Sequence, residues 1–119
     1  MDKYFPFSIT FVNGALRGSP EQMYQILADF ESPDLSAYKS LFEKYSPPEG
    51  LISLVDIVTL IIEGNAPDLS DHLDFDEEGY LLDIYADSEE AVQEFASVVS
   101  PAFQDIEELK RYVRKIADQ

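Results

Sequence analysis

Residues 72–87 read HLDFDEEGYLLDIYAD, in which apolar and charged side chains largely alternate on both sides of one glycine. A period of two is typical of a β-strand with one buried face, because successive side chains point to opposite sides of the strand. The glycine, Gly79, supplies the positive φ that a tight hairpin turn requires. The pattern therefore predicts two antiparallel strands, at residues 72–76 and 80–87, joined by a turn at residues 77–79.

The two faces of this hairpin differ in chemistry. One face is apolar, and we expect Leu73, Phe75, Leu82 and Ile84 to point from it into the core. The other face mixes acidic side chains with a leucine and a tyrosine, and apolar side chains among charges on an open face indicate a contact with another protein. The candidate partner-binding residues belong to this face and to the turn: His72, Asp74, Asp76, Glu77, Glu78, Leu81, Asp83 and Tyr85. The alternative is that a helix covers this face.

Two elements are predicted closer to the N-terminus. Residues 4–12 alternate large apolar side chains with smaller or polar ones, which predicts a strand that ends at an Asn-Gly pair. Residues 19–22, Ser-Pro-Glu-Gln, have the order of a helix start, and apolar side chains follow at positions 23, 26, 27 and 30. We therefore expect a helix over residues 19–30.

Four further helices are predicted from start and stop signals. Residues 32–45 begin at Ser-Pro and end before a Pro-Pro pair, and residues 51–63 are apolar on nearly all sides. A capping sequence at residues 87–90 starts a helix that we expect Pro101 to halt. The last helix starts near Asp105, with acidic residues first and basic residues later, an order that suits the helix dipole.

This order of elements predicts an α+β fold in one domain, residues 1–119. The expected architecture is a small antiparallel sheet of about three strands packed on one face by about five helices. If the N-terminal strand joins the hairpin, Ser8 and Thr10 line up beside the candidate residues on the open face.

The charge of the chain limits its partners. It has 8 basic and 24 acidic residues, for a net charge of −16, and residues 45–109 contain 17 of the acids and no lysine or arginine. A field of this sign disfavours nucleic acid and anionic membranes and attracts a basic protein, a cationic ligand or a metal ion, and composition alone does not choose among these three. The absence of cysteine fits a reducing compartment, and no apolar run is long enough to span a bilayer, so we expect a cytoplasmic, soluble protein.

Enzymatic chemistry has little support in the sequence. His72 is the only histidine, and a small hydrolase using it with Asp74 or Asp83 is one alternative. Residues 74–79 resemble the start of a calcium-binding loop, but the twelfth position, which must supply a bidentate glutamate, is Tyr85. We expect no metal, no cofactor and no catalytic residue.

Residues 66–79 (APDLSDHLDFDEEG) and 84–91 (IYADSEEA) resemble a pattern in the fifty-first family of polymorphic-toxin immunity proteins. The resemblance covers roughly residues 50–117. Where family members carry a Gly-Tyr-x-Trp-like element, this chain reads Glu-Gly-Leu-Ile at residues 49–52. The resemblance implies a bacterial cytoplasmic protein that binds and neutralises a cognate toxin and has no enzymatic activity. A generic acidic adaptor or nucleic-acid mimic, which would bind a basic partner, is the alternative; the chemistry of the toxin and the oligomeric state stay open.

Overall fold

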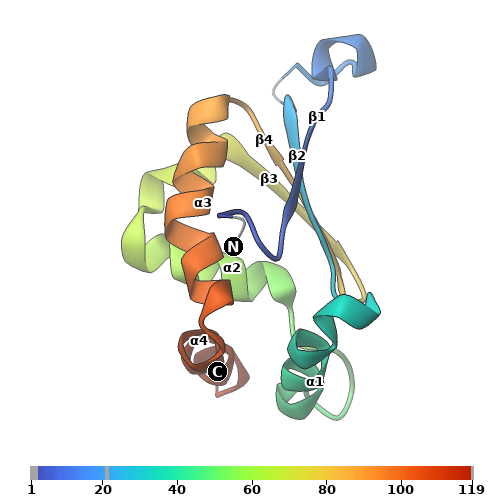
Figure 1. Cartoon of the computed structure of the whole chain (residues 1–119), viewed down its shortest axis with the longest axis vertical. Coiled ribbons are helices and arrows are strands. Elements are labelled where there is room, and N and C mark those ends of the chain that lie inside the picture. Colours follow the sequence, from blue (N-terminus) through green and yellow to red (C-terminus); the bar gives the residue numbers. More distant parts are fainter. Residues whose placement is uncertain (1–2, 21, 119) are drawn as a thin grey trace.

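One antiparallel sheet and a layer of helices form the part of the chain that the computed structural model describes, residues 3–20 and 22–118 (Figure 1). The sheet has the strand order β1-β2-β4-β3, and each neighbouring pair is antiparallel. The strands are β1 (Ser8–Phe11), β2 (Tyr24–Asp29), β3 (Leu73–Glu78) and β4 (Leu81–Ala86). The α-helices are α1 (Ser36–Tyr45), α2 (Leu54–Asn65), α3 (Glu89–Gln104) and α4 (Ile106–Ala117), and 3-10 turns occupy η1 (Gly14–Arg17), η2 (Pro33–Leu35) and η3 (Pro67–His72).

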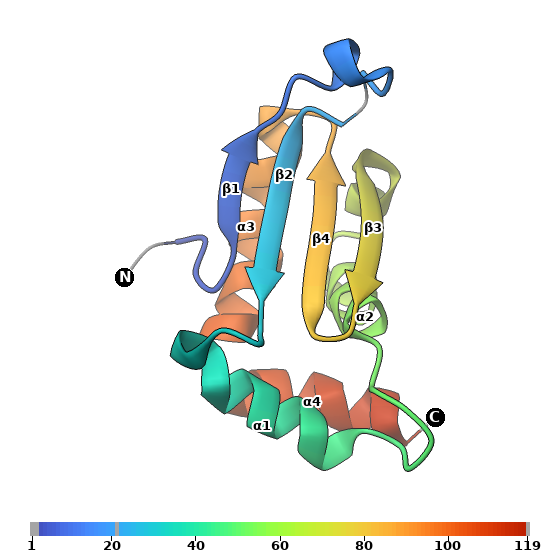
Figure 2. The same ribbon diagram turned by 90° about the vertical axis from the view of Figure 1, so that its right-hand side faces the viewer.

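The helices cover one face of the sheet and one of its ends. Figure 2 shows α2 and α3 behind the sheet and α1 and α4 beyond the end where the β3–β4 turn lies. No helix crosses the front of the sheet in this view, so the predicted α+β fold with helices on a single face is confirmed. The described sheet has four strands instead of about three. Within the described residues, no helix combines the length and the apolar character that a membrane crossing needs.

The extra strand is β2, and the predicted helix over residues 19–30 is wrong. Residues 24–29 form a strand that pairs with both β1 and β4. The apolar side chains of this segment fit the period of a helix and also the period of a strand. Ile26 and Phe30 fit both periods, and the buried Ala28 adds a position at the spacing of a strand. Pairing with two neighbours decides the outcome, since a central strand satisfies its backbone groups on both edges. Glu21, which belongs to the predicted start of that helix, lies outside the described residues.

The predicted N-terminal strand is shorter than expected. Residues 4–7 form a turn that contains a cis peptide bond between Phe5 and Pro6, and β1 begins only at Ser8. β1 pairs with β2 and not with the hairpin, so β2 separates Ser8 and Thr10 from the hairpin residues.

The other predicted elements are present with somewhat different ends, and the largest difference is in α3. This helix continues past Pro101 to Gln104, although a proline at this position cannot donate a hydrogen bond to Ser97. The extra turn buries Ala102 and Phe103, which are 3% and 1% exposed, and Phe103 O accepts a hydrogen bond of 2.6 Å from the Tyr38 hydroxyl. Burial of these groups offsets the lost backbone bond.

The hairpin turns at the predicted glycine, but the turn lies at residues 79–80 and not at residues 77–79, because Glu77 and Glu78 pair as part of β3. Glu78 pairs with Leu81, so Gly79 and Tyr80 form a two-residue loop, and Gly79 has φ of 61°. Tyr80 turns inward, is 5% exposed and stacks on Phe42 with ring centroids 6.3 Å apart. The hairpin is therefore anchored to the helix layer at its turn.

Candidate functional site

The uncovered side of the sheet forms one continuous surface from all four described strands. Three rows of side chains cross it in register: Thr10, Gln25, Tyr85 and Asp74; Ser8, Leu27, Asp83 and Asp76; and Asp29, Leu81 and Glu78. We call these eleven residues the open sheet face. Six of the eight candidate residues predicted from the sequence lie on it.

The open sheet face is acidic. It carries five carboxylates, Asp29, Asp74, Asp76, Glu78 and Asp83, and none of its members is a lysine or an arginine. Asp76 and Asp83 lie directly opposite each other on β3 and β4. Like charges in this position repel and destabilise a sheet, by a few tenths to about 1 kcal/mol.

Amide side chains hold two of these carboxylates in place. Gln25 Nε2 on β2 donates a hydrogen bond of 3.0 Å to Asp83 Oδ1. Gln22 Nε2 donates one of 3.4 Å to Asp74 Oδ2. An amide carries no net charge, so both contacts orient a carboxylate without neutralising it.

Apolar side chains lie among the charges. Leu27, Leu81 and Tyr85 are each partly exposed and occupy the two central strands of the face. Their counterparts on the opposite side, Ile26, Leu82 and Ile84, are fully buried against the helices. The open sheet face therefore interleaves apolar and acidic side chains: Asp83 lies between Leu81 and Tyr85 on β4, and three of the five carboxylates lie on the edge strand β3.

Glu77 lies on the opposite side of the sheet from the other acidic candidates. Its carboxylate accepts hydrogen bonds from Ser53 Oγ and Leu54 N, both at 2.7 Å, and from Val55 N at 3.3 Å. These donors form the N-terminus of α2, where unpaired N–H groups and the helix dipole favour a negative charge. The structure gives Glu77 the place of a helix cap and does not bring it into the open sheet face.

His72 lies at the end of β3, just beyond the open sheet face. Its Nδ1 is 2.8 Å from Asp87 Oδ2, and Asp87 N donates a hydrogen bond to His72 O. The hydrogen bond and the charge of Asp87 raise the pKa of His72 above its ordinary value, Asp71 and Glu94 add to this effect, and partial desolvation opposes it. The imidazole is 54% exposed, so the pair is a surface ion pair when His72 is protonated.

The surroundings of His72 bear on the hydrolase alternative. A hollow of about 50 Å³ lies beside the imidazole, lined by Asp71, Leu73, Asp74 and Asp87 together with His72. Pockets for small molecules usually measure a few hundred Å³ or more. The lining contains no hydroxyl or amine that could act as a nucleophile. Among residues 3–20 and 22–118, no three His, Asp or Glu side chains are arranged to hold a metal ion.

Sequence reasoning missed two parts of this surface. Gln25, Leu27 and Asp29 were assigned to a helix, although the buried positions 26, 28 and 30 also fit a strand. Asp87, rather than Asp74 or Asp83, is the carboxylate beside His72. Extending the hairpin register by one residue beyond the pair of Leu73 and Ala86 places His72 opposite Asp87, so this contact was predictable.

In comparisons with known proteins, no protein-family model, no curated protein and no solved structure matches this chain. The geometry and charge of the open sheet face are therefore the basis on which a function is inferred.

Proposed function

We propose that this protein is an immunity protein that binds a basic toxin domain through the open sheet face and neutralises it. The observation that carries the proposal is the surface itself: five carboxylates lie among Leu27, Leu81 and Tyr85 on a sheet face that the helices leave uncovered. The identity of the partner as a toxin comes from the resemblance of residues 66–79 and 84–91 to a family of immunity proteins, a pattern that includes β3 and half of β4.

The net charge supports fast capture of a basic partner. A charge of −16 on 119 residues produces a field that extends about 8 Å into a solution of physiological salt. Charge attraction of this kind raises association rates toward about 10⁸ to 10⁹ M⁻¹s⁻¹ at low salt. Fast association suits an inhibitor that must act before its toxin causes damage.

The opposed pair of Asp76 and Asp83 supports a cationic partner. The pair costs the free protein stability because the two carboxylates face each other across adjacent strands. A cation placed between them would remove the repulsion and satisfy both carboxylates. Binding would therefore be strengthened by relief of a cost that the unbound protein bears.

The proposal predicts that the gene upstream of this chain encodes a large secreted protein with a variable C-terminal domain, and the experiment that tests it uses that domain. Bacteria that express this domain in the cytoplasm stop growing if it is a toxin, and co-expression of the wild-type protein should restore growth. The double variant Asp74→Lys, Asp83→Lys should fail to restore growth while its melting temperature stays within a few degrees of wild type. Raised salt should slow association far more than it speeds dissociation.

A matched control separates the open sheet face from net charge. The double variant Glu43→Lys, Glu63→Lys changes the charge by the same amount at exposed positions on α1 and α2, away from the face. It should still restore growth. Absence of binding between the wild-type protein and the domain, or full protection by the Asp74→Lys, Asp83→Lys variant, would refute the proposal.

One observation favours the second candidate, an acidic adaptor or nucleic-acid mimic. Asp74, Asp76 and Glu78 alternate along the edge strand β3, so their Cα atoms are evenly spaced by about 6.8 Å. Such a row imitates the regular charges of a phosphate backbone. A mimic should release DNA from basic proteins in general, so displacement of DNA from purified histones at physiological salt would favour this candidate. An immunity protein should leave the histone–DNA complex intact.

A further inference from the structure

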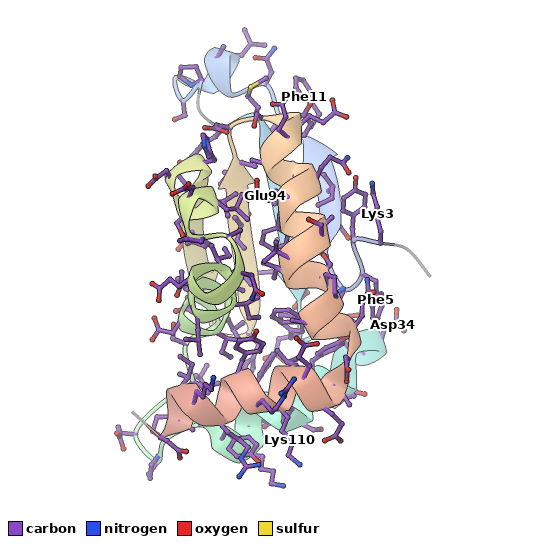
Figure 3. All side chains as sticks on the ribbon, turned by 90° about the vertical axis from the view of Figure 1, so that its left-hand side faces the viewer. Lys3, Phe5, Phe11, Asp34, Glu94 and Lys110 are labelled. Carbon is purple, nitrogen blue, oxygen red and sulfur yellow. The ribbon has the colours of Figure 1, made fainter. Side chains whose placement is uncertain are left out.

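A groove of about 440 Å³ opens beside the N-terminal turn, where β1 begins and β2 ends. Phe5 and Phe7 from the turn, Leu27 from β2 and Leu35 from η2 supply its apolar lining. Asp29 and Asp34 also line it, and both are exposed. We call this groove, defined by these six residues, the Phe5 groove; Figure 3 shows Phe5 and Asp34 together at this edge of the protein.

The Phe5 groove continues the open sheet face. Leu27 and Asp29 belong to both, and Ser8 of the open sheet face also lines the groove. Strands of six residues are about 20 Å long and four strands span about 19 Å, so the flat area of the face is about 400 Å². A stable interface buries about 800 Å² per partner. A partner seated on the sheet must therefore reach past its edges, and the groove lies at one of them.

The groove combines apolar walls with two carboxylates. Phe7 and Leu35 form a buried floor, at 3% and 9% exposed, while the Phe5 ring is 37% exposed. Asp29 Oδ1 accepts a hydrogen bond of 3.0 Å from Glu31 N, which fixes the direction of this carboxylate. An apolar ligand would desolvate the carboxylates without pairing them, and an anionic ligand would be repelled.

No described lysine or arginine lines the groove. Lys3 is close in sequence, but its Nζ donates a hydrogen bond of 2.6 Å to Gln93 Oε1 and lies 5.2 Å from the centre of the Tyr4 ring. Lys39, on α1, pairs with Glu31 at 2.8 Å. Lys3 and Lys39 are thus directed to other groups, and the lining of the groove carries two carboxylates and no basic side chain.

We propose that an arginine side chain of the basic partner enters the Phe5 groove and anchors the complex there, a proposal that rests on the function proposed for the open sheet face. The apolar stem of arginine fits against Phe7, Leu27 and Leu35. Its planar guanidinium stacks on the exposed Phe5 ring and donates in several directions at once to Asp29 and Asp34. A lysine ammonium fits less well, because it is more strongly hydrated and cannot stack.

The first test uses ethylguanidinium as the probe and follows the methyl NMR signals of the wild-type protein. The signals of Leu27 and Leu35 should shift and saturate at millimolar concentrations. Ethylammonium, which has the same charge, should bind at least about threefold more weakly. The variant Asp29→Asn, Asp34→Asn keeps the shapes of both side chains and should weaken ethylguanidinium binding at least about fivefold.

The variant Phe5→Leu tests the same groove if the variant Asp29→Asn, Asp34→Asn does not fold. It keeps an apolar wall and removes the aromatic face, so ethylguanidinium should lose its advantage over ethylammonium. Shifts that stay linear up to about 100 mM, or that centre on Asp74 and Asp83 instead of the groove, would overturn the proposal.

The second test uses the toxin domain defined above. In its complex with the wild-type protein, the variant Asp29→Asn, Asp34→Asn should raise the dissociation rate about tenfold or more and change the association rate less. If the domain binds the wild-type protein but dissociates from this variant at an unchanged rate, the anchor is refuted and the function of the open sheet face stands. If the domain does not bind the wild-type protein, both proposals fail.

Discussion

Glu77 and Glu78 are neighbours in sequence with opposite surroundings, and this difference leads to a sharp prediction. Glu77 accepts three hydrogen bonds from the start of α2, whereas Glu78 is exposed on the open sheet face. Replacement of Glu77 by alanine leaves the N–H groups of Leu54 and Val55 without their acceptor. The same replacement at Glu78 removes no contact of this kind.

The magnitude follows from these contacts. A hydrogen bond to a charged group contributes about 1.5 to 3 kcal/mol, and loss of a helix cap costs about 1 kcal/mol. The three bonds share one carboxylate and two of the donors lie at a helix end that water can partly reach, so their energies do not add. We expect Glu77→Ala to lower the free energy of unfolding by about 2 kcal/mol, which is about 8 °C in melting temperature for a domain of this size. Glu78→Ala should stay within about 0.5 kcal/mol.

Urea denaturation followed by circular dichroism measures both variants under the same conditions. A loss for Glu77→Ala no greater than that for Glu78→Ala would refute the assignment of Glu77 as the cap of α2. Glu77→Gln keeps one acceptor oxygen and should fall between wild type and Glu77→Ala. The Glu77 variants should also associate with the toxin domain at nearly the wild-type rate, since this side chain faces the helices.

Three further predictions test single features. Asp76→Asn removes the repulsion with Asp83 and should stabilise the protein by about 0.5 kcal/mol in urea denaturation, while it slows association with the partner. Because Asp87 raises the pKa of His72, the pair stabilises the fold below the unfolded pKa of about 6.5, and this contribution disappears as pH rises through the folded pKa. The stability of wild type relative to His72→Gln should therefore fall as pH rises above about 6.5. Gly14→Ala should cost about 2 kcal/mol, because a Cβ there would clash with backbone carbonyl oxygens of the following loop.

Each of these predictions has a control. Glu43→Gln removes one negative charge from α1 and should change neither stability nor association much. Asp87→Asn should flatten the same pH dependence as His72→Gln, and a pH profile that keeps its wild-type shape in both variants would exclude the ion pair as its source. Gly50→Ala should be nearly neutral, because a Cβ at Gly50 meets nothing within 4 Å. Equal losses at Gly14 and Gly50 would contradict the close approach at Gly14.

The candidate surface was only half predictable from the sequence. The hairpin could be predicted because its alternation and the glycine at its turn are local signals, and they also identify which face is buried. Glu77 was grouped with the exposed acids, although its place in the alternation puts it on the side of Leu73 and Phe75. Its role depends on α2, which begins more than twenty residues earlier, so the start of this helix had to be placed in space before the role became clear.

The N-terminal half shows how tertiary structure overrides a local pattern. Residues 23–30 fit a helix and a strand about equally well, and the cap-like residues before them favoured the helix. The backbone of β2 instead pairs with β1 on one side and β4 on the other, contacts that no short window of sequence contains. The same pairing adds Gln25, Leu27 and Asp29 to the open sheet face.

The sequence by itself determined the α+β class, the hairpin, four of the helices and the excess of negative charge, because periodicity, capping and composition act over a few residues. Tertiary structure decided that β2 fills the centre of the sheet, that Glu77 caps α2 and that the groove at Phe5 adjoins the acidic face. These features join segments distant in sequence, and the free energy that selects them comes from burial and hydrogen bonds formed only when those segments meet.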